Sequence, residues 1–107
     1  MDTEYEKQVM TLISSAGESR SLAFEALQSV KKHDYQKAKD LLQQSKDADV
    51  KAHNMQTAMI TQALKNKDQE EKMSLLMVHA QDHYMCAQLS RDLIEELINI
   101  FEERDKS

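Results

Sequence analysis

The chain has 107 residues, of which 40% are hydrophobic and 31% are charged, and this balance predicts one folded domain over residues 1–107. Its formal net charge is −5, from 19 acidic and 14 basic residues, which is the wrong sign for a protein that binds nucleic acid. A single cysteine excludes an internal disulfide, and the absence of a signal-peptide pattern or a bilayer-length apolar run predicts a soluble, cytoplasmic protein.

Three long helices are the expected architecture. Proline is absent and Gly17 is the only glycine, so the chain lacks most of the residues that end helices or shape hairpins. Ala, Leu, Gln, Lys and Glu, which all favour helix, fill the sequence instead. The predicted class is all-α, with antiparallel helices at about residues 3–31, 34–64 and 70–103.

The first helix is predicted to begin at Thr3, because Thr3 and Glu6 form a capping-box pattern ahead of an amphipathic run. Apolar residues then follow one side of this helix. This stripe consists of Tyr5, Val9, Leu12, Ala16, Ala23, Leu27 and Val30. Gly17 is an exception inside the helix, and we expect it to permit close packing.

A polar turn, Lys31–Asp34, separates the first two helices, and Asp34 is placed to accept a hydrogen bond from the free N–H groups of the second. The second helix has a heptad seam of mainly small side chains, which let helix axes approach closely. The seam consists of Ala38, Leu41, Ser45, Ala48, Ala52, Met55 and Met59. His53, Gln56 and Thr57 form a polar edge beside it, which fits either a solvated stripe or the lining of a cleft.

The second turn, Lys65–Glu70, has no apolar residue and is expected in solvent. Each predicted helix has about 28 to 33 residues and is over ~40 Å long, so one hairpin of three such rods buries little apolar surface. Long rods with apolar faces beyond one seam commonly complete their core by assembling. We therefore predict a homo-oligomeric bundle.

A carboxylate stands inside the apolar seam of the third helix, which consists of Leu75, Val78, Asp82, Met85 and Leu89. A buried carboxylate must be protonated, paired or bound to a cation, because desolvating the lone ion is costly. If like seams of several copies met on a symmetry axis, their Asp82 side chains would repel one another unless a cation such as Mg²⁺ lay between them. A local rotation that brings Asp82 to the surface is the alternative.

His79 and His83 lie four residues apart on one face of the third helix, with Asp82 about 60° around the helix from His79. A neutral imidazole is a competent nucleophile toward a phosphoryl donor near neutral pH, and a second imidazole can hydrogen-bond the transferred oxygens. Gln81 lies about 200° from His79, so it would reach such a group only at a site that a neighbouring helix builds.

Other functions fit the same residues. A histidine pair at this spacing is also typical of surface decoration or of core histidines with a hydrogen-bonded nitrogen. His79, Asp82, His83 and Cys86 offer Zn²⁺ ligands from consecutive turns, although the HExxH pattern is absent. Cys86 itself is predicted to be a small buried residue. A zinc-binding structural bundle, and a non-catalytic helical adaptor in which Asp82 fixes the oligomeric state, are therefore the alternatives.

The segment Val78–Met85, which reads Val-His-Ala-Gln-Asp-His-Tyr-Met, resembles the hallmark segment of the lactose/cellobiose class of enzyme IIA components of the bacterial phosphotransferase system. Blocks at Ala16–Ala23, Glu25–Leu27, Ala52–Thr57 and Asp92–Ile98 resemble family blocks in the same order. The similarity covers nearly the whole chain. Its histidine segment is highly specific in combination with the Ala-His-x-x-Gln-Thr block.

The resemblance implies a homotrimer of three-helix subunits, nine helices in all, with the phosphorylated histidine at His79. It implies that Asp82 meets its two copies on the threefold axis around a metal ion, for which we expect Mg²⁺. The phosphoryl group would come from the histidine-containing phosphocarrier protein and pass to a cysteine of the matching IIB component, and Cys86 is not that cysteine. In this scheme His83, and Gln81 of an adjoining subunit, steady the phosphoryl oxygens.

Two departures from the family pattern concern the turns. His33-Asp34 follows the first helix where members often have Gly-Asp, and the second turn lacks glycine, so the loop shapes are open.

The alanine at position 80 is similar to the residue in cellobiose and diacetylchitobiose members, whereas lactose members tend to have glycine there. The resemblance therefore favours a cellobiose- or chitobiose-type sugar over lactose. The sugar would be bound by the membrane component IIC and not by this chain.

Overall fold

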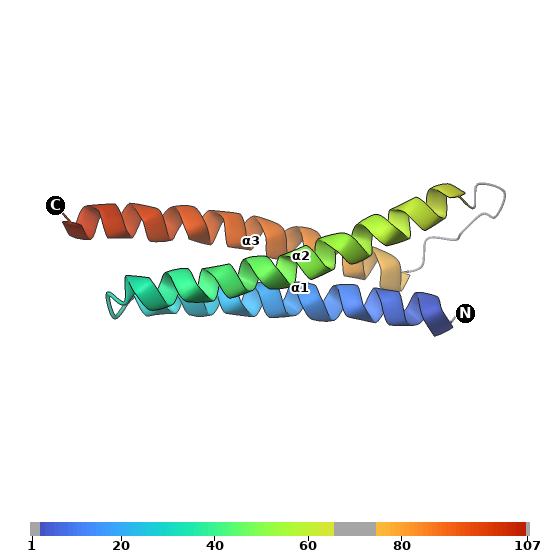
Figure 1. The fold of residues 1–107 in the computed structure, drawn as a ribbon, viewed down its shortest axis with the longest axis horizontal. Coiled ribbons are helices and arrows are strands. Elements are labelled where there is room, and N and C mark those ends of the chain that lie inside the picture. The colour runs from blue at the N-terminus through green and yellow to red at the C-terminus, as the bar shows by residue number, and fades with distance from the viewer. Residues whose placement is uncertain (1–2, 66–74, 107) are drawn as a thin grey trace.

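Three long helices make up the part of the chain that the computed structural model describes, residues 3–65 and 75–106. They are α1 (Thr3–Val30), α2 (Tyr35–Lys65) and α3 (Leu75–Lys106). They form a rod of 60 × 19 × 19 Å, with the α1–α2 turn and the C-terminal end of α3 at one end and the start of α1 at the other (Figure 1). No strand occurs among these residues, and the predicted all-α class is confirmed.

Two of the predicted features lie outside the described residues. These are the second turn beyond Lys65 and the start of the third helix near residue 70. α3 itself continues to Lys106, past the predicted end near residue 103. α1 and α2 begin and end within a residue or so of the predicted positions.

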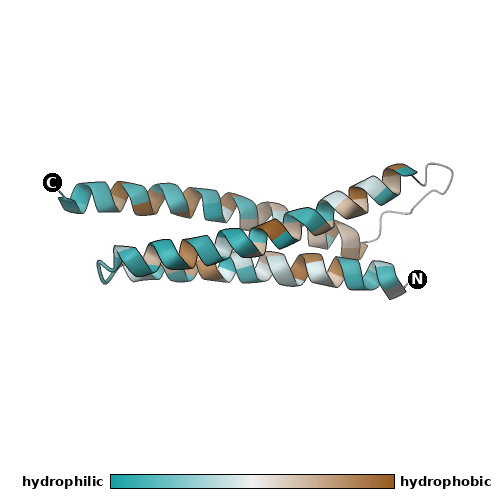
Figure 2. Ribbon diagram, viewed as in Figure 1, coloured by the Kyte–Doolittle hydropathy of each residue, from teal (hydrophilic) through white to brown (hydrophobic). Residues whose placement is uncertain are grey.

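The hydrophobic core is centred on α1, which packs extensively against both other helices, while α2 and α3 contact each other much less. Hydrophobic and hydrophilic residues are interspersed along all three ribbons, as expected for amphipathic helices (Figure 2). One buried cluster comprises Val9, Leu12, Ala16, Ala52, Met59, Ala80, Tyr84 and Ala87. The other comprises Ala23, Ala26, Ala38, Leu42, Ile94 and Ile98. The predicted stripe of the first helix and the small-residue seam of the second both supply this core.

Gly17 does not have the predicted role within the chain. A Cβ atom added at this position would meet no atom within 4 Å, other than those of its own helix turn. The close packing takes place beside it, where Ser15, Ala16 and Ser19 are buried. The expectation that Gly17 permits a close approach is therefore wrong for the single chain, because no other helix lies within contact distance of this position.

The α1–α2 turn contains a histidine in the left-handed backbone region. The N–H of Asp34 donates to the carbonyl of Ser29 at 3.1 Å, and the N–H of His33 donates to that of Val30 at 2.9 Å, as in a Schellman motif. His33 has a φ of 56°, a conformation that glycine usually supplies. Asp34 then caps α2 as predicted, because its Oδ1 accepts from the N–H of Lys37 at 3.1 Å.

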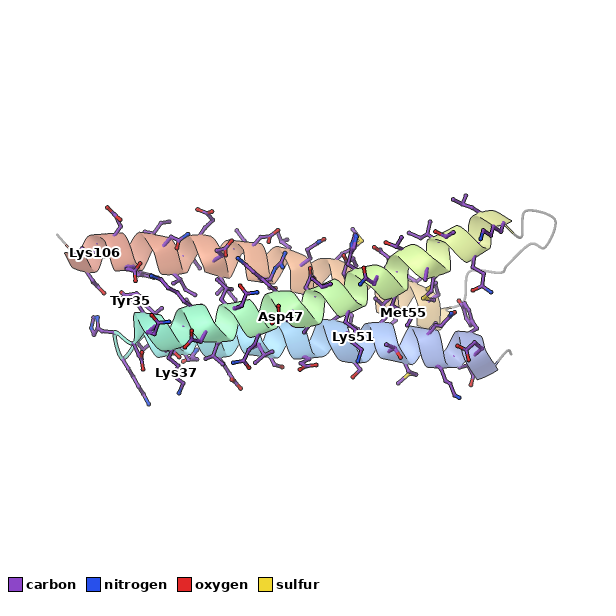
Figure 3. All side chains as sticks on the ribbon, viewed as in Figure 1. Tyr35, Lys37, Asp47, Lys51, Met55 and Lys106 are labelled. Atoms are coloured by element: carbon purple, nitrogen blue, oxygen red, sulfur yellow. The ribbon has the colours of Figure 1, made fainter. Side chains whose placement is uncertain are left out.

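The end of α3 is tied to this turn. Nδ1 of His33 lies 3.0 Å from Oδ2 of Asp105, and the Tyr35 hydroxyl donates to the same carboxylate oxygen. In Figure 3, Tyr35 lies at the start of α2 near the end of α3 that carries Lys106. The hydrogen bond to Asp105 raises the pKa of Tyr35 to about 12, and it is the main reason why the pKa of Asp105 is lowered. These contacts account for the extra length of α3.

A buried pair of serines fixes α1 against α2. The Ser19 hydroxyl donates to the carbonyl oxygen of Ser45 at 2.9 Å, and the Ser45 hydroxyl donates to that of Ser19 at 2.6 Å. Neither residue is exposed. Because each hydroxyl is satisfied only when the two positions lie opposite each other, the pair sets the register of the two helices.

Polar pairs, which we call the polar seam, join residues 35–56 of α2 to residues 81–105 of α3. Residue numbers rise along α2 as they fall along α3, because the helices are antiparallel. The pairs are Tyr35 with Asp105, Lys39 with Glu102, Lys46 with Glu95, Asp49 with Arg91, His53 with Tyr84, and Gln56 with Gln81. The polar seam explains how α2 and α3 are aligned although they share little apolar contact.

Asp49 and Arg91 are the buried ion pair of the polar seam. Asp49 is only 7% exposed, and its Oδ2 lies 3.3 Å from Nη1 of Arg91. Oδ1 of Asp49 and Nε of Arg91 are buried without a hydrogen-bond partner in the described chain. The buried Asp49 carboxylate therefore depends mainly on Arg91 for a counter-ion.

Arg91→Met is expected to lower the free energy of unfolding by about 3 to 5 kcal/mol, because it leaves the Asp49 carboxylate buried without its counter-ion. Chemical denaturation followed by circular dichroism measures this loss. Asp92→Asn is the matched control, since it removes an exposed carboxylate 3.1 Å from the same guanidinium group and should cost less than about 1 kcal/mol. Equal losses in the two variants would show that the buried pair is not the cause.

Candidate functional site

α3 brings His79 and His83 together as the sequence predicted. Their Nε2 atoms lie 3.0 Å apart, and the ring centroids are separated by 4.4 Å with the ring planes at 84°. His79 is exposed and His83 is half-buried. A hydrogen bond between two imidazole nitrogens requires one protonated and one unprotonated atom. With both rings neutral, one Nε2 of the pair donates and the other is an unprotonated acceptor, the form in which imidazole is a nucleophile.

His79 is the ring that a second protein can reach, because it is the more exposed of the two. When Nε2–H of His83 donates, Nε2 of His79 is the acceptor. The neutral His79 ring then carries its proton on Nδ1. His83 is then a hydrogen-bond donor directed at the position where a group bonded to His79 would lie. The arrangement suits transfer of an anionic group to His79 with His83 stabilising its charge.

Tyr84, which follows His83 in the chain, is a buried polar residue whose partner on α2 the sequence did not predict. It is 3% exposed, and its hydroxyl lies 3.0 Å from Nδ1 of His53 on α2, while Nε2 of Gln88 donates to it at 3.5 Å. Burial is the main cause of the raised pKa of Tyr84, and the charge of Asp49 adds to it. The hydroxyl therefore stays protonated, and the tautomer of His53 decides whether it donates to Nδ1 or accepts from it. This pairing depends on the register of two helices, so no pattern within one helix reveals it.

Gln81 is held on the opposite side of α3 from the histidine pair. Its Oε1 accepts a hydrogen bond from Nε2 of Gln56 at 2.6 Å, and both side chains are half-buried. No hydrogen bond joins Gln81 to His79 in the described chain. The predicted polar edge of the second helix is thus divided, because His53 and Gln56 bond to α3 whereas Thr57 is exposed.

An exposed apolar stripe runs along α3 on the side away from α1. Its members, with one carboxylate among them, are Leu75, Val78, Asp82, Met85, Leu89, Leu93, Leu97 and Ile100. Leu75 is 86% exposed, and Met85 and Leu89 are each 61% exposed. Asp82 is exposed too, and its carboxylate has no hydrogen-bond or ion-pair partner within the described residues. Contiguous apolar surface of this extent is typical of a face that another molecule covers.

Cys86 lies beside this exposed apolar stripe and is itself exposed, so the prediction of a buried cysteine is wrong for the single chain. The reason is its position on the helix. The buried face of α3 is formed by Ala80, Tyr84, Ala87, Ile94 and Ile98, and Cys86 points away from all of them. Its exposure does not make it a ligand.

The zinc set is not assembled in one chain. Among residues 3–65 and 75–106, no three side chains of the His, Cys, Asp and Glu types are grouped so that they could hold a metal ion. His79, Asp82, His83 and Cys86 therefore do not form a zinc site within a single subunit.

None of the described helices is long and apolar enough to cross a membrane.

The fold and the site define an elongated three-helix protein that presents a hydrogen-bonded pair of imidazoles beside an uncovered apolar stripe. Residues 7–102 match the family described as "PTS system, Lactose/Cellobiose specific IIA subunit". The chain belongs to this family, whose members are phosphotransfer components of the sugar phosphotransferase system (PTS). The resemblance inferred from the histidine segment is thereby confirmed.

Named relatives agree with this assignment. The N,N'-diacetylchitobiose-specific EIIA component of Escherichia coli K12 is 43% identical over 99 residues, which are 92% of this chain and 84% of the relative. The crystal structure of the cellobiose-specific enzyme IIA from Bacillus anthracis has a TM-score of 0.89 and 34% identity, covering 100% of this chain and 96% of that one. A solution structure of an E. coli IIA(Chitobiose)–HPr complex has a TM-score of 0.76 and 41% identity, covering 94% and 95%.

Proposed function

We propose that this chain accepts a phosphoryl group from the histidine-containing phosphocarrier protein, HPr, onto Nε2 of His79 and passes it to a cysteine of a IIB component. The observation that carries the proposal is the contact between Nε2 of the exposed His79 and Nε2 of His83, which places a hydrogen-bonding imidazole beside a reachable nucleophile. A similar IIA protein has been solved with HPr, which supports the donor. Membership of the PTS family supports the acceptor.

In the transfer step, Nε2 of His79 attacks the phosphorus atom of the donor in line with the leaving nitrogen. A bond forms between Nε2 and phosphorus, the phosphorus–nitrogen bond of the donor breaks, and its electron pair returns to the donor imidazole. Nε2–H of His83, which faces Nε2 of His79 at 3.0 Å, then donates to a phosphoryl oxygen instead. Transfer to a IIB cysteine runs the same way, with the thiolate as nucleophile.

We infer that three copies assemble around the exposed apolar stripe of α3 into a nine-helix bundle. His79 and Gln81 lie about 200° apart on α3, so they border the stripe on opposite edges. In a cyclic trimer with the stripes inward, one edge of each copy meets the opposite edge of the next. His79 of one subunit would then face Gln81 of its neighbour, so that the assembly completes each site.

Asp82 fits a role in binding a divalent cation on the axis of such a trimer. Its carboxylate is exposed, lacks a partner within the described residues, and lies among apolar neighbours such as Val78 and Met85. Three carboxylates that converge there provide hard oxygen ligands, the donors that Mg²⁺ prefers. A bound cation would neutralise their mutual repulsion.

The transported sugar is proposed to be of the chitobiose or cellobiose type, with lactose as the alternative. Support comes from the names of the E. coli relative and of the B. anthracis structure. The resemblance used Ala80 to favour a cellobiose- or chitobiose-type sugar. In the structure this residue is fully buried in the core. Its methyl group therefore acts on helix packing, and the choice of sugar belongs to the membrane component.

Phosphoryl uptake by the wild-type protein tests the proposal. Incubation with phosphoenolpyruvate, the general phosphotransferase enzyme and HPr should add one acid-labile phosphoryl group, detected by mass spectrometry. Nuclear magnetic resonance of the histidine side chains should place it on Nε2 of His79, and addition of a IIB component should remove it. A protein that assembles but takes up no phosphoryl group would instead be a non-catalytic adaptor.

A further inference from the structure

We propose that Gln56 of α2 is a positioning residue of this site, which holds the Gln81 amide so that its N–H groups face a phosphoryl oxygen. The inference rests on the proposed function, because it assigns a role in phosphoryl transfer. No hydrogen bond joins Gln56 to His79 or His83 within the described residues. It acts through Gln81, whose Oε1 accepts its hydrogen bond at 2.6 Å.

The orientation of the Gln81 amide follows from the polarity of this bond. A glutamine side chain carries an acceptor oxygen at one position and two N–H donors at the other. Because Nε2 of Gln56 donates to Oε1 of Gln81, the oxygen is occupied and the N–H groups remain available. A phosphoryl group has only acceptor oxygens, so it is stabilised by this orientation and repelled by the reverse one.

The rest of the polar seam keeps Gln56 in place. About one turn along both helices, the buried Tyr84 hydroxyl bonds to Nδ1 of His53 at 3.0 Å, which fixes α2 against α3 at this level. Gln56 and Gln81 are themselves half-buried, so water competes less for their hydrogen bond. The donor groups of Gln81 are therefore preorganised before any phosphoryl group arrives. They lie on the edge of α3 that would meet His79 of an adjoining subunit.

Three substitutions of Gln56 separate orientation from mere contact. Gln56→Lys can only donate and keeps the Gln81 amide as it is, so phosphoryl uptake should stay within about threefold of wild type. Gln56→Met frees the amide to populate both orientations, which should slow uptake a few-fold. Gln56→Glu can only accept, turns the amide around and should slow uptake about 10- to 100-fold at saturating donor.

Charge alone must be separated from amide orientation. Asn54→Lys and Asn54→Glu place the same charges at an exposed position of α2 two residues from Gln56, and both should take up phosphate at the wild-type rate. The side-chain amide resonances of Gln81 provide a readout that a purely structural role would not move. They should shift on phosphorylation in wild type and in Gln56→Lys, but not in Gln56→Glu.

Mixed assemblies test the placement across subunits. A Gln56→Glu chain has an intact His79, and a His79→Ala chain has a correctly held Gln81, so mixing the two should restore rapid uptake on the first chain. Equal rates in Gln56→Lys and Gln56→Glu, the reverse order, or no recovery on mixing would overturn the inference. A wild-type protein that takes up no phosphate would instead overturn the proposed function.

Discussion

Replacing His79 by alanine is expected to abolish phosphoryl uptake, because no other described imidazole combines exposure with a second histidine within hydrogen-bond distance. The measurement is the mass gain after incubation with phosphoenolpyruvate, the general phosphotransferase enzyme and HPr. His33→Ala is the matched control, since His33 is also exposed but lies at the opposite end of the rod, against Asp105. It should take up phosphate at the wild-type rate.

The neighbouring histidine should contribute less than the nucleophile. His83→Ala removes the hydrogen bond to a charged oxygen, which is worth about 1.5 to 3 kcal/mol and so corresponds to a roughly 10- to 100-fold slower uptake. His83→Gln retains an N–H donor and should recover part of the rate. If His79→Ala retained its label while His83→Ala lost it, the roles of the two rings would be exchanged and the assignment based on exposure would be wrong.

Local signals made most of the fold predictable. The absence of proline and the periodicity of apolar residues gave three helices, and the position of Asp34 before an amphipathic run gave a cap that the hydrogen bond to Lys37 confirms. These features depend on residues that are close in sequence. His33 shows the limit, because its left-handed conformation follows from closure of the turn and contact with Asp105, and not from its own preference.

Contacts between helices were not predictable, because they depend on register. The Ser19–Ser45 pair, the Asp49–Arg91 ion pair and the polar seam as a whole join residues that are distant in sequence. Periodicity indicates which side of a helix is apolar, but α3 has two such sides, one against α1 and one exposed. The seam that contains Asp82 was therefore recognised as apolar, while the structure was needed to show that it lies outside the core of one chain.

The same distinction applies to the site. The i, i+4 spacing placed His79 and His83 on one face, and the structure brings their Nε2 atoms within hydrogen-bond distance. The angular separation of Gln81 from His79 was also readable from helix geometry. What the sequence lacked was the partner of Gln81, since nothing within the third helix indicates that Gln56 of the second approaches it.

Asp82→Leu is expected to preserve or strengthen the assembly and to make it independent of divalent cations. The substitution replaces a convergent charge by an apolar side chain that continues the exposed apolar stripe, and replacing ionic groups at a packed contact by apolar ones is often neutral or stabilising. Sedimentation and thermal unfolding, each with and without a chelator, measure the effect. Comparisons need one fixed protein concentration, because the stability of an oligomer depends on it.

The wild-type protein should respond to the chelator where Asp82→Leu does not. A cation at 100 times its dissociation constant stabilises the species that binds it by about 2.7 kcal/mol, and a chelator removes that contribution. Asp47→Leu, at an exposed aspartate of α2, is the control and should respond to the chelator as wild type does. Dissociation of Asp82→Leu into monomers would contradict the axial position, because three leucines on the axis would pack against one another. If wild type and Asp82→Leu are both trimers whose stability does not change with the chelator, the exposed apolar stripe is still the interface. The proposal of a cation on the axis is then wrong.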